Sequence, residues 1–189
     1  MMSNESVMTG EFRVSYPNVL KPNDDGKYTV SMLFDKKKLK SNKAELAKYN
    51  ELKAMVNNLL EKNDCEQGPF RDGDERTTKD GKPDPVYAGK IYAEAKTQFE
   101  PEVFDRNRQD IISEKDFEPG CYARARVHAY HWTFKNKEGV ALGFDAIQKL
   151  HEALPGDPKI ESRSSAKDSF DELDDAGDDV SSSDDDLLA

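Results

Sequence analysis

The feature that most limits the fold of this chain is a strict alternation of residue types between Cys121 and Phe134. Side chains along a β-strand point alternately to opposite faces, so odd and even positions form two separate sets. The odd set is mostly small or apolar, as a tight barrel interior requires: Cys121, Ala123, Ala125, Val127, Ala129, His131 and Thr133. The even set carries four aromatic rings, two guanidinium groups and an imidazole: Tyr122, Arg124, Arg126, His128, Tyr130, Trp132 and Phe134.

The same period of two recurs in shorter runs. Residues 11–16 and 27–34 flank the turn signal at residues 22–26, which predicts a hairpin. The apolar side of the first run, expected to face the core, is Phe12, Val14 and Tyr16. Further strands are predicted at residues 91–99 and, more weakly, at 103–112. After a turn at residues 136–139, the long strand is expected to meet a partner that carries Val140, Leu142 and Phe144.

Helical spacing appears in two places. Ser41 offers an N-cap, and the apolar residues between Tyr49 and Leu60 form one stripe of an amphipathic helix of about 20 residues. A short closing helix is predicted from the spacing of Ile147, Leu150 and Leu154. Between these helices, residues 63–86 are rich in glycine, proline and charge, and a loop of this length inside a domain is usually functional or mobile.

Together these elements predict a mainly β fold, an OB-like antiparallel β-barrel with one inserted helix and a short closing helix. Roughly six strands are expected. The barrel domain is predicted to span residues 1–158. Residues 159–189 are dominated by serine and aspartate, have too few apolar residues to offset the entropy of ordering, and are predicted to form a disordered acidic tail.

The net charge of -10 is confined to the end of the chain. Residues 168–189 contain ten acidic residues and no lysine or arginine, which leaves 28 acidic and 28 basic residues in 1–167. The acidic composition therefore describes the tail, and it does not exclude a nucleic acid as the ligand of the domain.

The chain shows no signal peptide, no apolar run of membrane-spanning length, and two cysteines without metal-ligand spacing. We therefore expect the protein in a reduced cytoplasm. The sequence predicts no catalytic residue, no metal site and no cofactor. His128 and His131 fall on opposite faces of one strand, so they are not expected to bind one ion.

The even face of the long strand is the candidate binding site. Aromatic rings stack on unpaired bases, cationic groups follow phosphates, and arginine does both. Lys90, Tyr92 and Lys96 are expected to extend this surface on a neighbouring strand. The face therefore predicts binding to single-stranded nucleic acid. The alternative is that the rings pack under a loop or helix while the arginines are ordinary surface charges.

The acidic tail is the second functional signal. A tethered polyanion would compete for a cationic groove and, once displaced by DNA, become available to protein partners. The tail ends in acidic residues followed by apolar ones, which suits docking into a basic-rimmed pocket: Asp184, Asp185, Asp186, Leu187 and Leu188. A charge run that only increases solubility is the simpler interpretation.

Three segments resemble a family of tailed-phage single-stranded DNA-binding proteins: residues 14–19 (VSYPNV), 27–31 (KYTVS) and 139–148 (GVALGFDAIQ). The likeness covers about residues 8–157. It implies an OB-type fold, a role in phage replication or recombination, protein partners from phage or host, and a location in the cytoplasm of an infected bacterium. Tails in such proteins commonly end in a phenylalanine, whereas this chain ends in Leu187-Leu188-Ala189. A homodimer is left open.

Two other classes of protein remain as alternatives. Pro83-Asp84 followed by Glu94-Ala95-Lys96 matches the loose PD-(D/E)xK pattern of Mg²⁺-dependent nucleases, although Asp84 lies in the predicted loop. An acidic interaction protein or DNA mimic would explain the tail but would leave the arginine-rich face without a role.

Overall fold

The computed structural model describes residues 6–160. Within them lie eight strands: β1 (Ser6–Met8), β2 (Phe12–Asn18), β3 (Tyr28–Asp35), β4 (Arg71–Asp72), β5 (Lys90–Thr97), β6 (Glu102–Phe104), β7 (Tyr122–Phe134) and β8 (Lys137–His151). The helices of this part of the chain are α1 (Lys36–Ser41) and α2 (Lys43–Lys62), with short 3-10 turns at Gly73–Glu75 and Glu114–Asp116.

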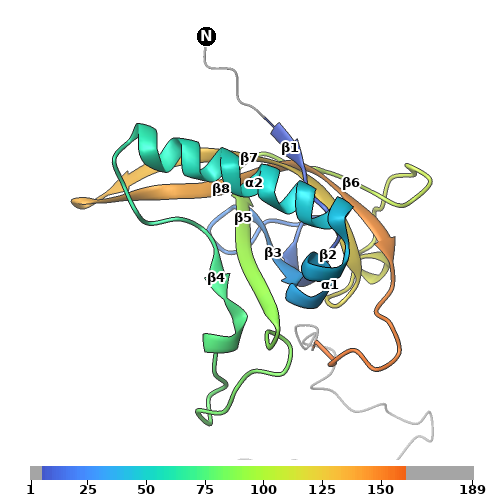
Figure 1. The fold of residues 1–189 in the computed structure, drawn as a ribbon. Helices are drawn as coiled ribbons and strands as arrows, with labels where there is room; N and C mark the ends of the chain where they lie inside the picture. Colours follow the sequence, from blue (N-terminus) through green and yellow to red (C-terminus); the bar gives the residue numbers. More distant parts are fainter. Residues whose placement is uncertain (1–5, 161–189) are drawn as a thin grey trace, which may run out of the picture.

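Five of the strands close into a ring. The pairing runs from β7 to β2, β3, β5 and β8 and returns to β7, while β1, β4 and β6 attach at the sides. This is the OB-like barrel that the sequence predicts, but its pairs are not all antiparallel. The β5–β8 pair is parallel, joined at Ala95 and Leu142, whereas only antiparallel pairs are expected from the sequence. Figure 1 shows α2 lying beside β7 and β8, against which it packs.

The alternation along β7 is confirmed from Tyr122 to Val127, but not beyond: His131 is half-buried and Thr133 is exposed, so neither lies in the barrel interior as predicted. Ala123, Ala125 and Val127 are buried in the core, and the even positions between them are exposed or half-buried. The small side chains let the strand curve tightly around the large residues that fill the ring. Among these are Phe12, Met32, Phe34, Leu142 and Phe144, all at most 2 % exposed.

The predicted hairpin of residues 11–34 is confirmed as β2 and β3. The prediction that Tyr16 shares a face with Phe12 and Val14 is wrong. A bulge between Ser15 and Asn18 interrupts the ladder, and Tyr16 takes a left-handed backbone with φ of 47°. Bulges redirect side chains, and the Tyr16 ring is 62 % exposed instead of lying in the core. For a bulky residue before a proline this backbone is strained, at a cost of about 1–3 kcal/mol.

The inserted helix is confirmed, with a different start. Ser41 is the last residue of α1, and Asn42 caps α2 by accepting hydrogen bonds from the backbone N–H groups of Ala44 and Glu45. The N-cap predicted at Ser41 is therefore wrong, and Asn42 caps the helix instead. On α2, the stripe buries Tyr49, Leu52 and Val56 against the barrel.

The predicted closing helix is wrong, because β8 continues as a strand to His151. A bulge leaves Asp145 unpaired, since Arg126 lies opposite Ala146 and Val127 opposite Phe144. Burial does not alternate along this part of β8: Leu142, Gly143 and Phe144 are buried before Asp145, and Ala146 and Ile147 are buried after it. The broken period resembles helical spacing in the sequence, yet β7 and β6 hold the segment in the sheet from both sides.

The weaker strand predicted at residues 103–112 is only partly present. β6 ends at Phe104 and runs parallel to β8, and the chain then folds back so that Ile111 N–H bonds to the carbonyl of Val103. The long loop after α2 is partly ordered by β4, which pairs with β5.

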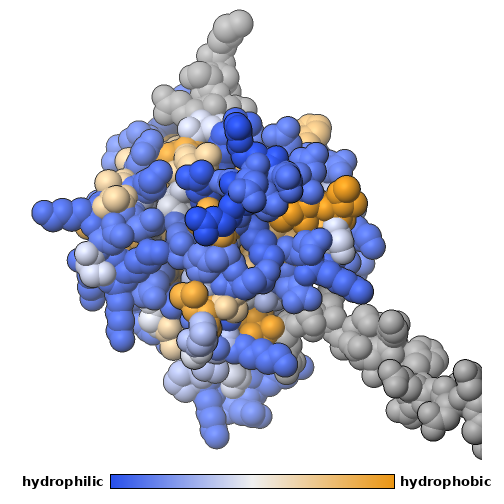
Figure 2. Space-filling model, turned by 90° about the vertical axis from the view of Figure 1, so that its right-hand side faces the viewer, coloured by the Kyte–Doolittle hydropathy of each residue, from blue (hydrophilic) through white to orange (hydrophobic). Residues whose placement is uncertain are grey.

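Large exposed side chains are scattered over the described surface. Figure 2, which faces the right-hand side of Figure 1, shows a mostly hydrophilic surface with small, separate hydrophobic patches. Among the described residues, four aromatic rings are exposed: Tyr130 and Phe134 on β7, Phe99 just after β5, and Tyr16 on β2, which pairs with β7. No helix within residues 6–160 combines the length and the apolar character that a membrane span requires.

Candidate nucleic-acid interface

The outer half of the β7–β8 hairpin, residues 130–141, extends beyond the ring and is called the arm below (Figure 1). Its strands pair with each other from Tyr130–Ala141 to Phe134–Lys137. The chain reverses at Lys135 and Asn136, both with positive φ, which is a tighter turn than the one expected at 136–139.

Three rings of β7 lie opposite very small residues of β8. The pairs are Trp132–Gly139, Tyr130–Ala141 and His128–Gly143. A Cβ atom placed on Gly139 would lie 3.0 Å from the Trp132 ring, and one on Gly143 would lie 2.5 Å from the His128 ring. The Trp132 and His128 rings therefore rest across the β8 backbone, because no side chain stands under them.

A shallow cleft of about 320 Å³ lies where the arm meets β5 and the loop after α2. It is lined by Gln67, Gly68, Pro69, Arg71, Tyr92, Glu94, Lys96, Tyr130, Trp132, Val140, Ala141 and Leu142. The structure thus brings Tyr92 and Lys96 of β5 together with Tyr130 and Trp132 of β7, as the sequence predicts. Three rings and a cation from two strands share one open surface.

Arg71 is a cleft residue that the sequence analysis missed. Its guanidinium donates to the backbone carbonyls of Gly68 and Phe70, at 2.7 and 3.0 Å. Within residues 6–160 it has no carboxylate at ion-pair distance, whereas Lys96 has Glu94 at 3.7 Å. The loop that carries Arg71 was expected to be functional, but its length alone could not select this residue.

The phenol of Tyr130 carries no charge at neutral pH. Partial burial of the ring, with the nearby Glu94 carboxylate, raises the pKa of this phenol further above its ordinary value. A neutral phenol adds no negative charge to the cleft, so the ring can stack on a base without repelling the adjoining phosphates.

The other half of the predicted face lies far from the cleft. Ten residues of strand separate Tyr122 from Trp132, which is about 33 Å at 3.3 Å per residue. Tyr122 stacks on His151 and donates a hydrogen bond to Asp157. The burial of Tyr122 and this bond raise the pKa of its phenol to about 12.

The two arginines of this half are bound to neighbouring side chains. Arg124 donates to the Gln148 side chain at 2.8 Å, and Arg126 forms a two-pronged ion pair with Asp145 at 2.8 Å. Arg126 remains half exposed. Both guanidinium groups face outward as predicted, but the charge of Arg126 is already compensated by Asp145.

Three further predicted residues lie outside the cleft lining. Lys90 pairs with Asp35 at 3.2 Å, at the opposite end of β5 from Lys96. His128 lies between the two halves of the face, 6.3 Å from the Tyr130 ring. Phe134 is 64 % exposed at the tip of the arm.

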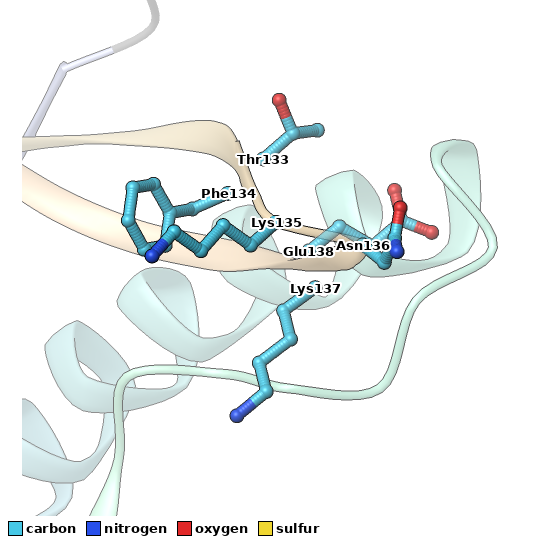
Figure 3. A pocket seen from close by; sticks show the side chains of 6 residues that line it. All are labelled: Thr133, Phe134, Lys135, Asn136, Lys137 and Glu138. Atoms are coloured by element: carbon cyan, nitrogen blue, oxygen red, sulfur yellow. The ribbon is translucent and has the colours of Figure 1, made fainter.

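The tip of the arm forms a second hollow, of about 440 Å³, lined by residues 133–138. Figure 3 shows Lys135 folded toward the Phe134 ring, with Lys137 pointing to another side. The Lys135 ammonium lies 5.3 Å from the ring centroid. The tip thus offers an aromatic ring and two cations to a polyanion.

The residues of the nuclease pattern do not form a metal site. Asp84 faces Arg76 at 3.7 Å, and Glu94 pairs with Lys96. No group of three or more potential metal ligands occurs within residues 6–160. The tail residues predicted to dock partners, Asp184–Leu188, lie outside the described residues.

Comparison with known proteins identifies solved structures with the same fold. The single-stranded DNA-binding protein from bacteriophage Enc34 has the same fold, with a TM-score of 0.63 and 18 % identity over 90 % of this chain and 92 % of that chain. The same protein in complex with single-stranded DNA matches with a TM-score of 0.62 and 18 % identity, covering 82 % of this chain and 90 % of that chain. No curated protein sequence matches significantly.

A family model described as the single-stranded DNA-binding protein of Enterobacter phage Enc34 matches residues 5–181. The match includes both the barrel and most of the acidic segment. Proteins of this family bind single-stranded DNA and are not enzymes. The chain belongs to the family of the phage Enc34 single-stranded DNA-binding protein.

Proposed function

We propose that this protein coats and protects single-stranded DNA during phage replication or recombination. The observation that carries the proposal is the cleft between β5 and the arm, where Tyr92, Tyr130 and Trp132 meet Lys96. Unpaired bases stack on the rings, and the cations follow the phosphates. The face continues along β7 in one direction to Phe134 and in the other through His128 to Arg126, Arg124 and Tyr122. Lys90 adds a cation on β5, outside the cleft.

The open shape of the cleft favours a polymer over a small molecule. A pocket for a small ligand usually encloses most of its surface, whereas this cleft is shallow and its rings lie on an outer sheet face. Stacking platforms of this kind accept every base, because every base has a π-face. Binding is therefore expected to show little sequence preference.

The proposal divides the chain into a binding domain, residues 1–158, and an acidic tail, residues 159–189. The tail competes with DNA for the cationic surface and, once displaced, docks phage or host replication or recombination proteins. Its last apolar residues, Leu187 and Leu188, would enter the partner. The protein acts in the cytoplasm of the infected bacterial host.

Trp132, the only tryptophan, provides the test. Adding oligo-dT should quench its fluorescence, because a base stacks on the indole. Trp132→Ala and Tyr130→Ala should each weaken binding by about 1–3 kcal/mol with little change in salt dependence, since no charge is removed. A fluorescent label on the oligonucleotide measures the affinity of the variant that lacks tryptophan.

Phe99→Ala is the matched control. Phe99 is a 73 % exposed ring that does not line the cleft, so its removal should leave the affinity unchanged. An unquenched Trp132 in a protein that still binds oligo-dT would move the site to another face.

A further inference from the structure

Arg76 lies in a cage of tyrosine rings beside the cleft. Its guanidinium carbon is 4.0 Å from the ring centroid of Tyr87, 5.5 Å from that of Tyr92 and 6.0 Å from that of Tyr16. All three distances are within the range of a cation–π interaction. Its partner Asp84 is 3.7 Å away, and one third of the arginine side chain stays exposed. The cage therefore holds a cation that solvent and ligands can reach.

The base of the cage is rigid. Tyr87 is 2 % exposed, shares a hydrogen bond of 2.9 Å with the Ser15 hydroxyl and meets the Tyr92 ring edge-on at 4.9 Å. Tyr87 thereby fixes residues 76–87 against β2 and β5. Arg76 is held in place by this buried ring and not only by its charge.

Tyr16 forms the open wall of the cage. The bulge in β2 and the left-handed backbone turn this ring out of the core, and it stays 62 % exposed. Strained backbone in a bulky residue persists where the surrounding structure enforces it, and such positions cluster at binding sites. An exposed ring with a guanidinium beside it is the same combination that the cleft presents.

Tyr92 connects the two places. It lines the cleft with Tyr130 and Trp132, and its ring also touches the cage of Arg76. Tyr92 is therefore common to the cleft and to the cage that holds Arg76 and Tyr16.

We infer that Tyr16 and Arg76 form a second binding subsite for single-stranded nucleic acid, at which Tyr16 stacks on a base and Arg76 holds the adjoining phosphate. This inference rests on the proposed function and extends the site from β7 and β5 to β2. It concerns strands long enough to reach beyond the cleft.

Two substitutions of Tyr16 test the subsite. Tyr16→Asn removes the ring while asparagine tolerates the left-handed backbone, so the fold is kept. Tyr16→Phe keeps the ring. The affinity for a series of oligo-dT lengths is measured through Trp132 quenching, in the full chain. For the shortest oligomer that quenches Trp132, Tyr16→Asn should have the wild-type affinity. For long oligomers, its affinity should be lower by about fivefold or more. Tyr16→Phe should bind every length like wild type.

Arg76→Lys tests the guanidinium. Lysine keeps the charge but loses the planar group that stacks and binds phosphate in two-pronged fashion. The affinity for long oligomers should fall while that for the shortest stays unchanged. If Tyr16→Asn and Arg76→Lys bind all lengths like wild type, the second subsite is refuted although the cleft still binds. If wild type itself neither binds nor quenches, the proposed function fails instead.

Discussion

At the scale of single residues, the outer face of β7 divides into two kinds of position. Tyr130 and Trp132 lie opposite Ala141 and Gly139, so no large side chain of β8 competes for their rings. Arg126, by contrast, donates two hydrogen bonds of 2.8 Å to the carboxylate of Asp145. A phosphate must replace that carboxylate before Arg126 can contribute fully to binding.

Asp145 therefore sets how much Arg126 contributes. Asp145→Asn releases the guanidinium, and we expect tighter binding of oligo-dT and a salt slope steeper by about 0.7, the value for one additional phosphate on a single strand. Arg126→Ala should weaken binding and make the slope shallower by a similar amount or less. Titrations at several salt concentrations measure both. Identical slopes for wild type and Asp145→Asn would show that no phosphate reaches Arg126.

The alternation of β7 was predictable from the sequence because a strand has a fixed period of two. The exposure of Tyr16 was not predictable, since a bulge changes the face of a residue without a local signal in its alternation. The ion pair of Arg126 also depends on the bulge at Asp145, which no periodicity reveals.

At the scale of elements, the arm is a two-stranded hairpin that extends beyond the ring and needs support, because an isolated hairpin is only marginally stable. Support comes from the loop after α2. The backbone N–H of Val140 donates to the carbonyl of Gln67 at 2.9 Å, and this contact closes one side of the cleft. The cleft thus depends on a loop docked on a strand.

Gly139 allows that docking. A Cβ atom at this position would lie 2.6 Å from the Gln67 carbonyl oxygen, which is backbone and cannot swing aside. Gly139→Ala should therefore move the loop, lower the melting temperature and weaken oligo-dT binding. Gly143→Ala is the comparison for stability, because the three atoms nearest to its Cβ belong to the movable His128 side chain and not to the loop backbone, so it should lower the melting temperature less. Equal effects of the two substitutions would argue against a special role for the loop contact.

The elements that the sequence predicted correctly are those with a clear period in the sequence: β2 up to its bulge, β3, β5, β7 and α2. The errors fall where tertiary pairing overrides spacing. Ile147 and Leu150 show helical spacing, yet β6 and β7 pair with this segment and keep it extended. In the cleft, Arg71 comes close to Trp132 through the path of a loop, which depends on contacts between distant parts of the chain.

At the scale of the whole molecule, charge is unevenly distributed along the chain. The net charge of -10 equals the ten acidic residues of 168–189, and the rest is balanced. In the proposed function this segment competes with DNA for the same cations.

A chain that ends at Lys167 tests the competition. It should bind oligo-dT more tightly than the full chain at low salt, and the advantage should shrink as the Debye length falls from about 30 Å at 0.01 M to about 10 Å at 0.1 M. Its melting temperature should not change, because residues 168–189 are mostly serine and aspartate and offer few apolar side chains to a core. Unchanged affinity at every salt concentration would leave the tail only a docking or solubilising role.

The central claim is that exposed aromatic rings select single strands, and one comparison tests it most directly. The full chain is titrated with labelled oligo-dT and with duplex DNA of equal length over a range of salt concentrations. Bases in a duplex are already stacked, so the account predicts clearly tighter binding of oligo-dT at every salt concentration, with affinity falling by about 0.7 in log–log slope for each phosphate contacted. Equal affinity for the two DNAs would contradict it.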